Sequence, residues 1–181
     1  MVARATYPVS LDSNENPFGP SSHAVEAMVA EASNSARYSE DVSELLRAQI
    51  AQREGVEPGQ IIFGLGGGQA LEMFALYLSD TVGLADGGEV VSCTPTYLRF
   101  IESVERHGGF SVAVPANAAL EHDLEAMEAV VGPRTRCVYI CNPNNPTGTV
   151  VDPAALRSLV GRLTKTCAVL LDEAYLECSE E

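Results

Sequence analysis

Short apolar runs alternate along this chain with longer segments whose apolar residues recur at helical spacing, and this alternation limits the possible folds more than any other feature. The runs are rich in Val, Ile, Leu and Cys and comprise residues 61–63, 89–93, 111–114, 137–141 and 167–171. Such runs are typical of strands buried on both faces, as in parallel sheets covered by helices. We therefore expect an α/β fold in which helices cover a parallel or mixed sheet.

One-sided helices are predicted where apolar residues recur every three or four positions. This spacing occurs in residues 25–29, 42–50, 71–78, 124–131 and 156–163. Gly55 and Gly108-Gly109 each follow a predicted helix, and Asp152-Pro153 begins one. Pro58-Gly59 is expected to form a turn that leads into the apolar run 61–63. The stretch Asn14–Pro20 (NENPFGP) is incompatible with regular structure, so it predicts an extended N-terminal arm.

The composition is that of a globular protein, with 46% hydrophobic and 20% charged residues among 181. A formal net charge of −14 would repel a phosphate backbone, which argues against a nucleic-acid partner. No apolar run approaches the roughly 18 residues that span a bilayer, and the first residues lack a signal-peptide core, so we expect a cytoplasmic protein with no membrane contact. Five cysteines, mostly in apolar runs, and three scattered histidines indicate reduced core thiols and no metal site.

Polar clusters follow four of the five predicted strands. They are Gly64–Gln69 (GLGGGQ), Thr94–Tyr97 (TPTY), Asn142–Gly148 (NPNNPTG) and Asp172–Tyr175 (DEAY). In open α/β sheets, ligands bind beyond the carboxyl ends of the strands. We therefore expect all four clusters to lie at one edge of the sheet and to form the functional site.

Each cluster has a functional and a structural interpretation. Glycines 66–68 at a helix start suit a bound phosphate, or they only permit a tight turn. Asp172 follows an apolar strand and needs a cation or hydrogen-bond donors, unless it caps the following helix. Asn145 and Tyr175 are candidate donors to one ligand oxygen, or they cap a turn and pack in the core. A dinucleotide fingerprint fits worse, because Gln69 stands where a third glycine is needed.

Taken in order, these segments resemble the fold-type I aminotransferases that use pyridoxal 5′-phosphate, and within them the histidinol-phosphate aminotransferase-like branch. The motifs that carry the resemblance cover nearly the whole chain and are Asn14–Pro20, Arg37–Glu40, Gly66–Glu72, Thr94–Tyr97, Asn142–Gly148 and Asp172–Tyr175. The resemblance implies a three-layer helix/sheet/helix domain with a mostly parallel sheet, here the incomplete large domain, in residues 51–181. Residues 1–50 would form an N-terminal arm and helices that contribute to the small domain and to dimer contacts.

The resemblance also implies how the cofactor ring is held. Asp172 would face the pyridinium nitrogen and keep it protonated, which preserves the ring as an electron sink. Asn145 and Tyr175 would hold the phenolic oxygen of the ring, and Tyr97 would stack on the ring. These four residues are the expected ring-binding set.

The cofactor phosphate would be bound by a second set of residues. By the same resemblance, the amides near Gly67, Gly68 and Gln69 would receive it, and Tyr38 would reach the phosphate of the neighbouring subunit's cofactor. A homodimer is therefore implied. Gln69 and Gly68 depart from the acid and the side chain that are usual at these positions, so we expect a looser phosphate site and leave the substrate open.

The absence of a catalytic lysine is the largest departure. The family needs a Schiff-base lysine, which follows the Asp-x-x-Tyr motif by a few tens of residues, and an arginine that binds the substrate carboxylate. Lys165 is the only lysine and lies about 15 Å along the strand from Asp172, at the wrong end of the sheet. We therefore assign no catalytic residue and expect the amino-terminal part of a transaminase, with weakened cofactor binding and no activity alone.

Several alternatives stay open from the sequence. The substrate would be an amino acid or an amino-alcohol phosphate such as histidinol phosphate. Another fold-type I chemistry, such as a phospho-amino-acid decarboxylase, would share the residues that hold the ring. A scaffold that has lost the chemistry is the alternative outside enzymes.

Overall fold

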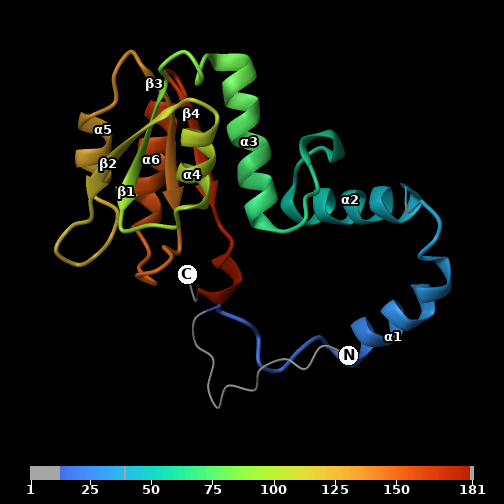
Figure 1. Ribbon diagram of the computed structural model, residues 1–181. Helices are drawn as coiled ribbons and strands as arrows, with labels where there is room; N and C mark the ends of the chain where they lie inside the picture. Colours follow the sequence, from blue (N-terminus) through green and yellow to red (C-terminus); the bar gives the residue numbers. More distant parts are fainter. Residues whose placement is uncertain (1–12, 39, 180–181) are drawn as a thin grey trace. The chain divides into compact units, whose positions relative to one another are not determined.

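The computed structural model of the protein describes residues 13–38 and 40–179 (Figure 1). The chain forms two compact units, Met1–Ile61 and Ile62–Glu181. Every strand in the described part of the chain belongs to the second unit. The edge of the sheet, where ligands bind in α/β proteins, is therefore built by the second unit.

The second unit contains a parallel four-stranded sheet with the strand order β2-β1-β3-β4. The strands are β1 (Glu89–Thr94), β2 (Phe110–Pro115), β3 (Thr135–Cys141) and β4 (Ala168–Asp172). Each strand corresponds to one predicted apolar run, with small shifts at the ends. The predicted parallel sheet is confirmed.

Helices cover both faces of this sheet, as Figure 1 shows. The helices are α3 (Gly67–Val82) and α4 (Arg99–Arg106) on one face and α5 (Leu124–Ala129) and α6 (Pro153–Leu163) on the other. Asp152 caps α6 as predicted, because its carboxylate accepts a hydrogen bond of 2.7 Å from the backbone N–H of Ala155. The three-layer helix/sheet/helix arrangement is therefore confirmed.

Two hydrophobic cores lie between these layers, and the alternation of side chains along the strands separates them. Tyr139 of β3 packs with Leu78 and Phe100 on the α3/α4 face. Val138, its neighbour in sequence, packs with Leu159 and other residues on the opposite face. Both faces of β3 are buried, which explains why its sequence is apolar almost throughout.

The strand predicted at residues 61–63 is absent, and this prediction is wrong. These residues follow a 3₁₀ helix, Pro58–Gln60, where a turn into a strand was expected, and they stand outside the four-stranded sheet. Ile62 is 76% exposed. A strand is stable only when a neighbouring strand pairs with its backbone, so an apolar run without such pairing does not become one.

The first unit contains the predicted helices α1 (Ser22–Glu31) and α2 (Glu40–Glu54), with a short 3₁₀ turn after α1. Gly55, with a φ of +67°, follows the last residue of α2 as predicted. Ala51 is the one buried residue among those described in the two helices. No helix in the described ranges is both long and apolar enough to cross a membrane.

Candidate functional site

The carboxyl ends of β3 and β4 lie side by side and bring two predicted polar clusters together. Cys141 pairs with Asp172 in the parallel ladder. The backbone N–H of Asn142 donates a hydrogen bond of 2.9 Å to the carbonyl of Asp172. The clusters Asn142–Gly148 and Asp172–Tyr175 therefore begin next to each other, as the sequence predicts.

Asn144 is the centre of the turn that follows β3, and it is almost fully buried. Its Oδ1 accepts a hydrogen bond of 2.8 Å from the Thr96 hydroxyl, and its Nδ2 donates to the carbonyl of Pro95 at 3.1 Å. The same Nδ2 donates to the hydroxyl of Thr147 at 2.8 Å. Asn144 thus joins the turn after β1 to the turn after β3, a role that sequence reasoning missed because it considered Asn145 alone.

Asp172 ends β4, is half-buried and accepts two hydrogen bonds. The Tyr139 hydroxyl donates to Oδ2 at 3.0 Å, and the backbone N–H of Ala174 donates to Oδ1 at 3.2 Å. Tyr139 thus provides a hydrogen-bond donor of the kind that we expect this carboxylate to need. The hydrogen bond from Ala174 belongs to a local turn. Each carboxylate oxygen has a second lone pair, so the group can still accept a hydrogen bond from a ligand.

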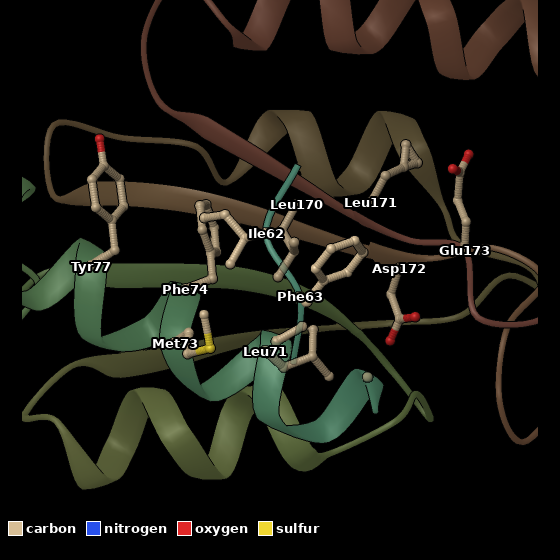
Figure 2. A pocket seen from close by; sticks show the side chains of 12 residues that line it. Ile62, Phe63, Leu71, Met73, Phe74, Tyr77, Leu170, Leu171, Asp172 and Glu173 are labelled. Carbon is tan, nitrogen blue, oxygen red and sulfur yellow. The ribbon is translucent and has the colours of Figure 1, made fainter. Parts of the chain in front are cut away.

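An apolar cavity of about 540 Å³ lies beside Asp172. It is lined by residues of α3, β4 and the segment before α3, among them Phe63, Leu71, Phe74 and Leu170. In Figure 2 the Asp172 carboxylate lies at one end of this cavity, near Leu71. The carboxylate therefore lies at the end of a mainly apolar space that is open to solvent on one side.

Asn145 and Tyr175 meet at this edge. The Nδ2 of Asn145 lies 3.5 Å from the Tyr175 hydroxyl, which is the outer limit of a hydrogen bond. Both side chains are half-buried. The structure therefore brings the predicted amide, carboxylate and phenol to the same edge of one sheet.

The N-terminus of α3 has the shape that the glycine cluster predicts. Gly66 precedes the helix with a φ of +79° and provides no side-chain cap. Gln69 already uses two of its hydrogen-bonding groups within the protein. Its Oε1 accepts a hydrogen bond of 2.6 Å from the N–H of Leu65, and its backbone N–H donates to the Gly66 carbonyl at 3.2 Å. Gly67 and Gly68 are thus the better candidates among the three predicted phosphate-binding amides.

Arg99 lies near this helix start and was missed by sequence reasoning. A Cβ atom on Gly68 would lie 3.6 Å from Nε of Arg99. The Arg99 side chain therefore lies in van der Waals range of the Gly68 position, and its cation adds to the favourable field of the helix N-terminus for an anion.

The two remaining predicted residues differ in their positions. Tyr97 is half-buried and packs against the core on the α3/α4 face, after the carboxyl end of β1. Tyr38 belongs to the first unit and is 97% exposed. Tyr97 is thus part of the sheet unit that carries the site, and Tyr38 is a residue of the other unit.

His122 is a buried polar residue behind the site. Its Nε2 lies 2.8 Å from the carbonyl oxygen of Cys141, which can only accept, so Nε2 carries the proton. Burial lowers the pKa of His122, and the hydrogen bond to Cys141 offsets only part of that effect. The imidazole is therefore neutral near pH 7 and supports the end of β3.

Cys93, Cys137 and Cys141 are buried, and all five cysteines are free thiols. Burial raises the pKa of the Cys93 and Cys141 thiols, which lowers their reactivity. Within the ranges 13–38 and 40–179, no three His, Cys, Asp or Glu side chains form a group that could hold a metal ion.

Lys165 lies at the opposite edge of the sheet from Asp172. It lines a surface pocket together with Thr135 and Ala168, which are the first residues of β3 and β4. Asp172 is the last residue of β4. The geometry thus agrees with the prediction that this lysine is remote from the site.

Comparison with known proteins gives matches over nearly the whole chain. The family model described as aminotransferase class I and II matches residues 7–181. The histidinol-phosphate aminotransferase of Moorella thermoacetica is 38% identical over 168 residues, which are 92% of this chain and 42% of that protein. The chain therefore spans less than half the length of this curated relative.

Solved structures agree with this match. The structure of histidinol-phosphate aminotransferase from Sinorhizobium meliloti in complex with pyridoxal-5′-phosphate has a TM-score of 0.83 and 29% identity, covering 92% of this chain and 44% of that one. L-threonine-O-3-phosphate decarboxylase from Porphyromonas gingivalis has a TM-score of 0.69 over 88% of this chain and 46% of its own, but its 19% identity supports the fold alone. The extent of the family match decides the assignment: the chain belongs to the class I and II aminotransferases.

Proposed function

We propose that the edge of the sheet in this chain binds the ring of pyridoxal 5′-phosphate and forms part of an aminotransferase of the histidinol-phosphate type. The observation that carries the proposal is the convergence of Asp172, Asn145 and Tyr175 from two neighbouring strands. The 38% identity to a histidinol-phosphate aminotransferase supports this substrate class, an amino acid or amino-alcohol phosphate, over the decarboxylase alternative.

The residues at the edge fit this cofactor. Asp172 retains an acceptor site beside an apolar cavity, which suits a flat ring with a protonated nitrogen. Asn145 and Tyr175 can donate to the phenolic oxygen, and Tyr97 offers an aromatic face. Gly67 and Gly68 begin a helix beside Arg99, which favours an anion.

Each side chain has a distinct role in this proposal. Bound pyridoxal phosphate would supply an electron-withdrawing ring that stabilises negative charge on a substrate carbon. Asp172 keeps a proton on the ring nitrogen, and Asn145 and Tyr175 fix the orientation of the ring. Lys165 lies too far away to serve as the amine base, so we expect this chain to bind the cofactor without a covalent bond and more weakly than a chain with a lysine at the ring.

Titration of pyridoxal phosphate against the wild-type chain and Asp172→Ala tests the proposal. We expect the variant to bind about 10- to 100-fold more weakly, because a charge-assisted hydrogen bond contributes about 1.5–3 kcal/mol. Asp80→Ala is the matched control, because Asp80 is an exposed aspartate at the other end of α3. Equal affinities of wild type and Asp172→Ala would refute the contact with the ring nitrogen.

A second copy of the chain is the partner that we propose for the first unit. Helices α1 and α2 expose apolar side chains, including Met28 (58%), Val29 (70%) and Leu45 (61%). Helices in proteins gain most of their stability by packing an apolar face against another element. In such a dimer Tyr38 would be free to reach the cofactor phosphate of the other subunit.

Sedimentation velocity tests the dimer. We expect self-association of the wild-type chain and a larger monomer fraction for Leu45→Glu, because a charge on the apolar face opposes its burial. Arg53→Glu, near the end of α2, is the charge control. A wild-type monomer that melts cooperatively would contradict the dimer. We also propose a cytoplasmic location, which the free thiols support because such thiols are typical of a reducing compartment.

A further inference from the structure

Tyr139 is a buried tyrosine in the middle of β3 that the proposed function does not use. Its side chain is fully buried on the α3/α4 face of the sheet. Its ring packs against Phe100 with a centroid distance of 5.1 Å and an interplanar angle of 51°. This packing fixes the ring and therefore the position of the hydroxyl group.

The hydroxyl of Tyr139 has a specific partner. It donates a hydrogen bond of 3.0 Å to Oδ2 of Asp172. Burial raises the pKa of Tyr139 well above its usual range, and the charge of Asp172 acts in the same direction. The phenol is therefore protonated near neutral pH and can donate to the carboxylate.

The register of the sheet explains why this bond forms. Tyr139 pairs with Leu170, and Asp172 lies two residues further along β4 on the same face. The long phenol side chain reaches along the strand to the carboxylate. Because Ala174 holds the other carboxylate oxygen, both oxygens of Asp172 are fixed before any ligand binds.

We propose that Tyr139 is a positioning residue of the cofactor site, whose hydroxyl holds the Asp172 carboxylate in the orientation that meets the ring nitrogen of pyridoxal phosphate. The inference rests on the proposed function and adds a residue that touches no cofactor atom. Its physical basis is preorganisation, because a carboxylate that is already fixed loses less freedom when the ring binds.

A double-mutant cycle between Tyr139→Phe and Asp172→Ala tests this inference. The probe is 4′-deoxypyridoxine 5′-phosphate, which lacks the aldehyde and so cannot react with Lys165. Tyr139→Phe keeps the ring that packs on Phe100 and removes only the hydroxyl. We expect about tenfold weaker binding from Tyr139→Phe alone and less than a twofold change in the Asp172→Ala background.

Two controls separate positioning from a general structural effect. Thr166→Val removes a hydroxyl group at the opposite edge of the sheet, just before β4, and should leave the affinity unchanged. Inorganic phosphate, which has no ring, should bind wild type and Tyr139→Phe equally. Melting temperatures of all variants report whether each one folds.

The outcomes distinguish the inference from the function on which it rests. If Asp172→Ala binds the probe as tightly as wild type, the proposed function fails and the role of Tyr139 fails with it. If Asp172→Ala weakens binding but Tyr139→Phe does not, the positioning role alone is overturned. Equal losses from Tyr139→Phe in both backgrounds also overturn it, because the hydroxyl would then act without Asp172.

Discussion

Replacement of Phe100 by alanine is expected to lower the free energy of unfolding of the sheet unit by about 3–5 kcal/mol. Phe100 is fully buried between α4 and the sheet. Its ring lies 5.1 Å from the ring of Tyr139 and 6.1 Å from that of Phe74, measured between centroids. Truncation removes apolar contacts from the centre of the α3/α4 core and leaves a cavity that its neighbours cannot fill.

Urea unfolding followed by circular dichroism measures this loss. Phe110→Ala is the matched control, because Phe110 begins β2 and is 61% exposed. We expect the control to lose less than about 1 kcal/mol. A loss for Phe100→Ala no larger than that of the control would show that the aromatic cluster is not the centre of the core.

Asn144→Ala is expected to cost about 2–4 kcal/mol of stability, because it removes three hydrogen bonds at a buried position. The substitution leaves the Thr96 hydroxyl, the Pro95 carbonyl and the Thr147 hydroxyl without this partner. It also frees the turn that carries Asn145, so we expect weaker binding of pyridoxal phosphate as well.

Asn145→Ala provides the contrast with Asn144→Ala. Asn145 is half-buried, and its contact with Tyr175 is 3.5 Å long. Its truncation should therefore lower the free energy of unfolding by less than about 1 kcal/mol, while it weakens the binding of the cofactor. Chemical denaturation and cofactor titration of the two variants check this separation. Equal stability losses would mean that the buried network of Asn144 does not support the turn.

The strands of the sheet could be predicted because their cause is local. A run that is apolar on both faces, such as Cys137–Cys141, has few alternatives to a buried strand. The run 61–63 has the same local appearance, yet it forms no strand, because pairing depends on what lies beside it. Local pattern thus identifies candidate strands, and only the tertiary environment decides which of them pair.

The candidate site could be predicted only in part, for a related reason. Asp172 and Asn145 stand out because a carboxylate and an amide directly after apolar runs are unusual. Asn144 does not stand out from Asn145, because its role depends on Thr96, which is 48 residues away in sequence. Tyr139 has the pattern of a strand residue, and only the register of β3 with β4 brings its hydroxyl to Asp172.

The closeness of these site residues in the sequence, from β3 to just beyond β4, also has a genetic consequence. Tyr139, Asn145, Asp172 and Tyr175 all lie within residues 139–175, so one short segment of the sequence contains all four. A recombination event with its breakpoint upstream of codon 139 would transfer all four side chains, with their mutual hydrogen bonds, in a single step. The receiving chain would still have to provide Thr96 and Phe100, which lie upstream of codon 139 and support the Asn145 turn and the Tyr139 ring.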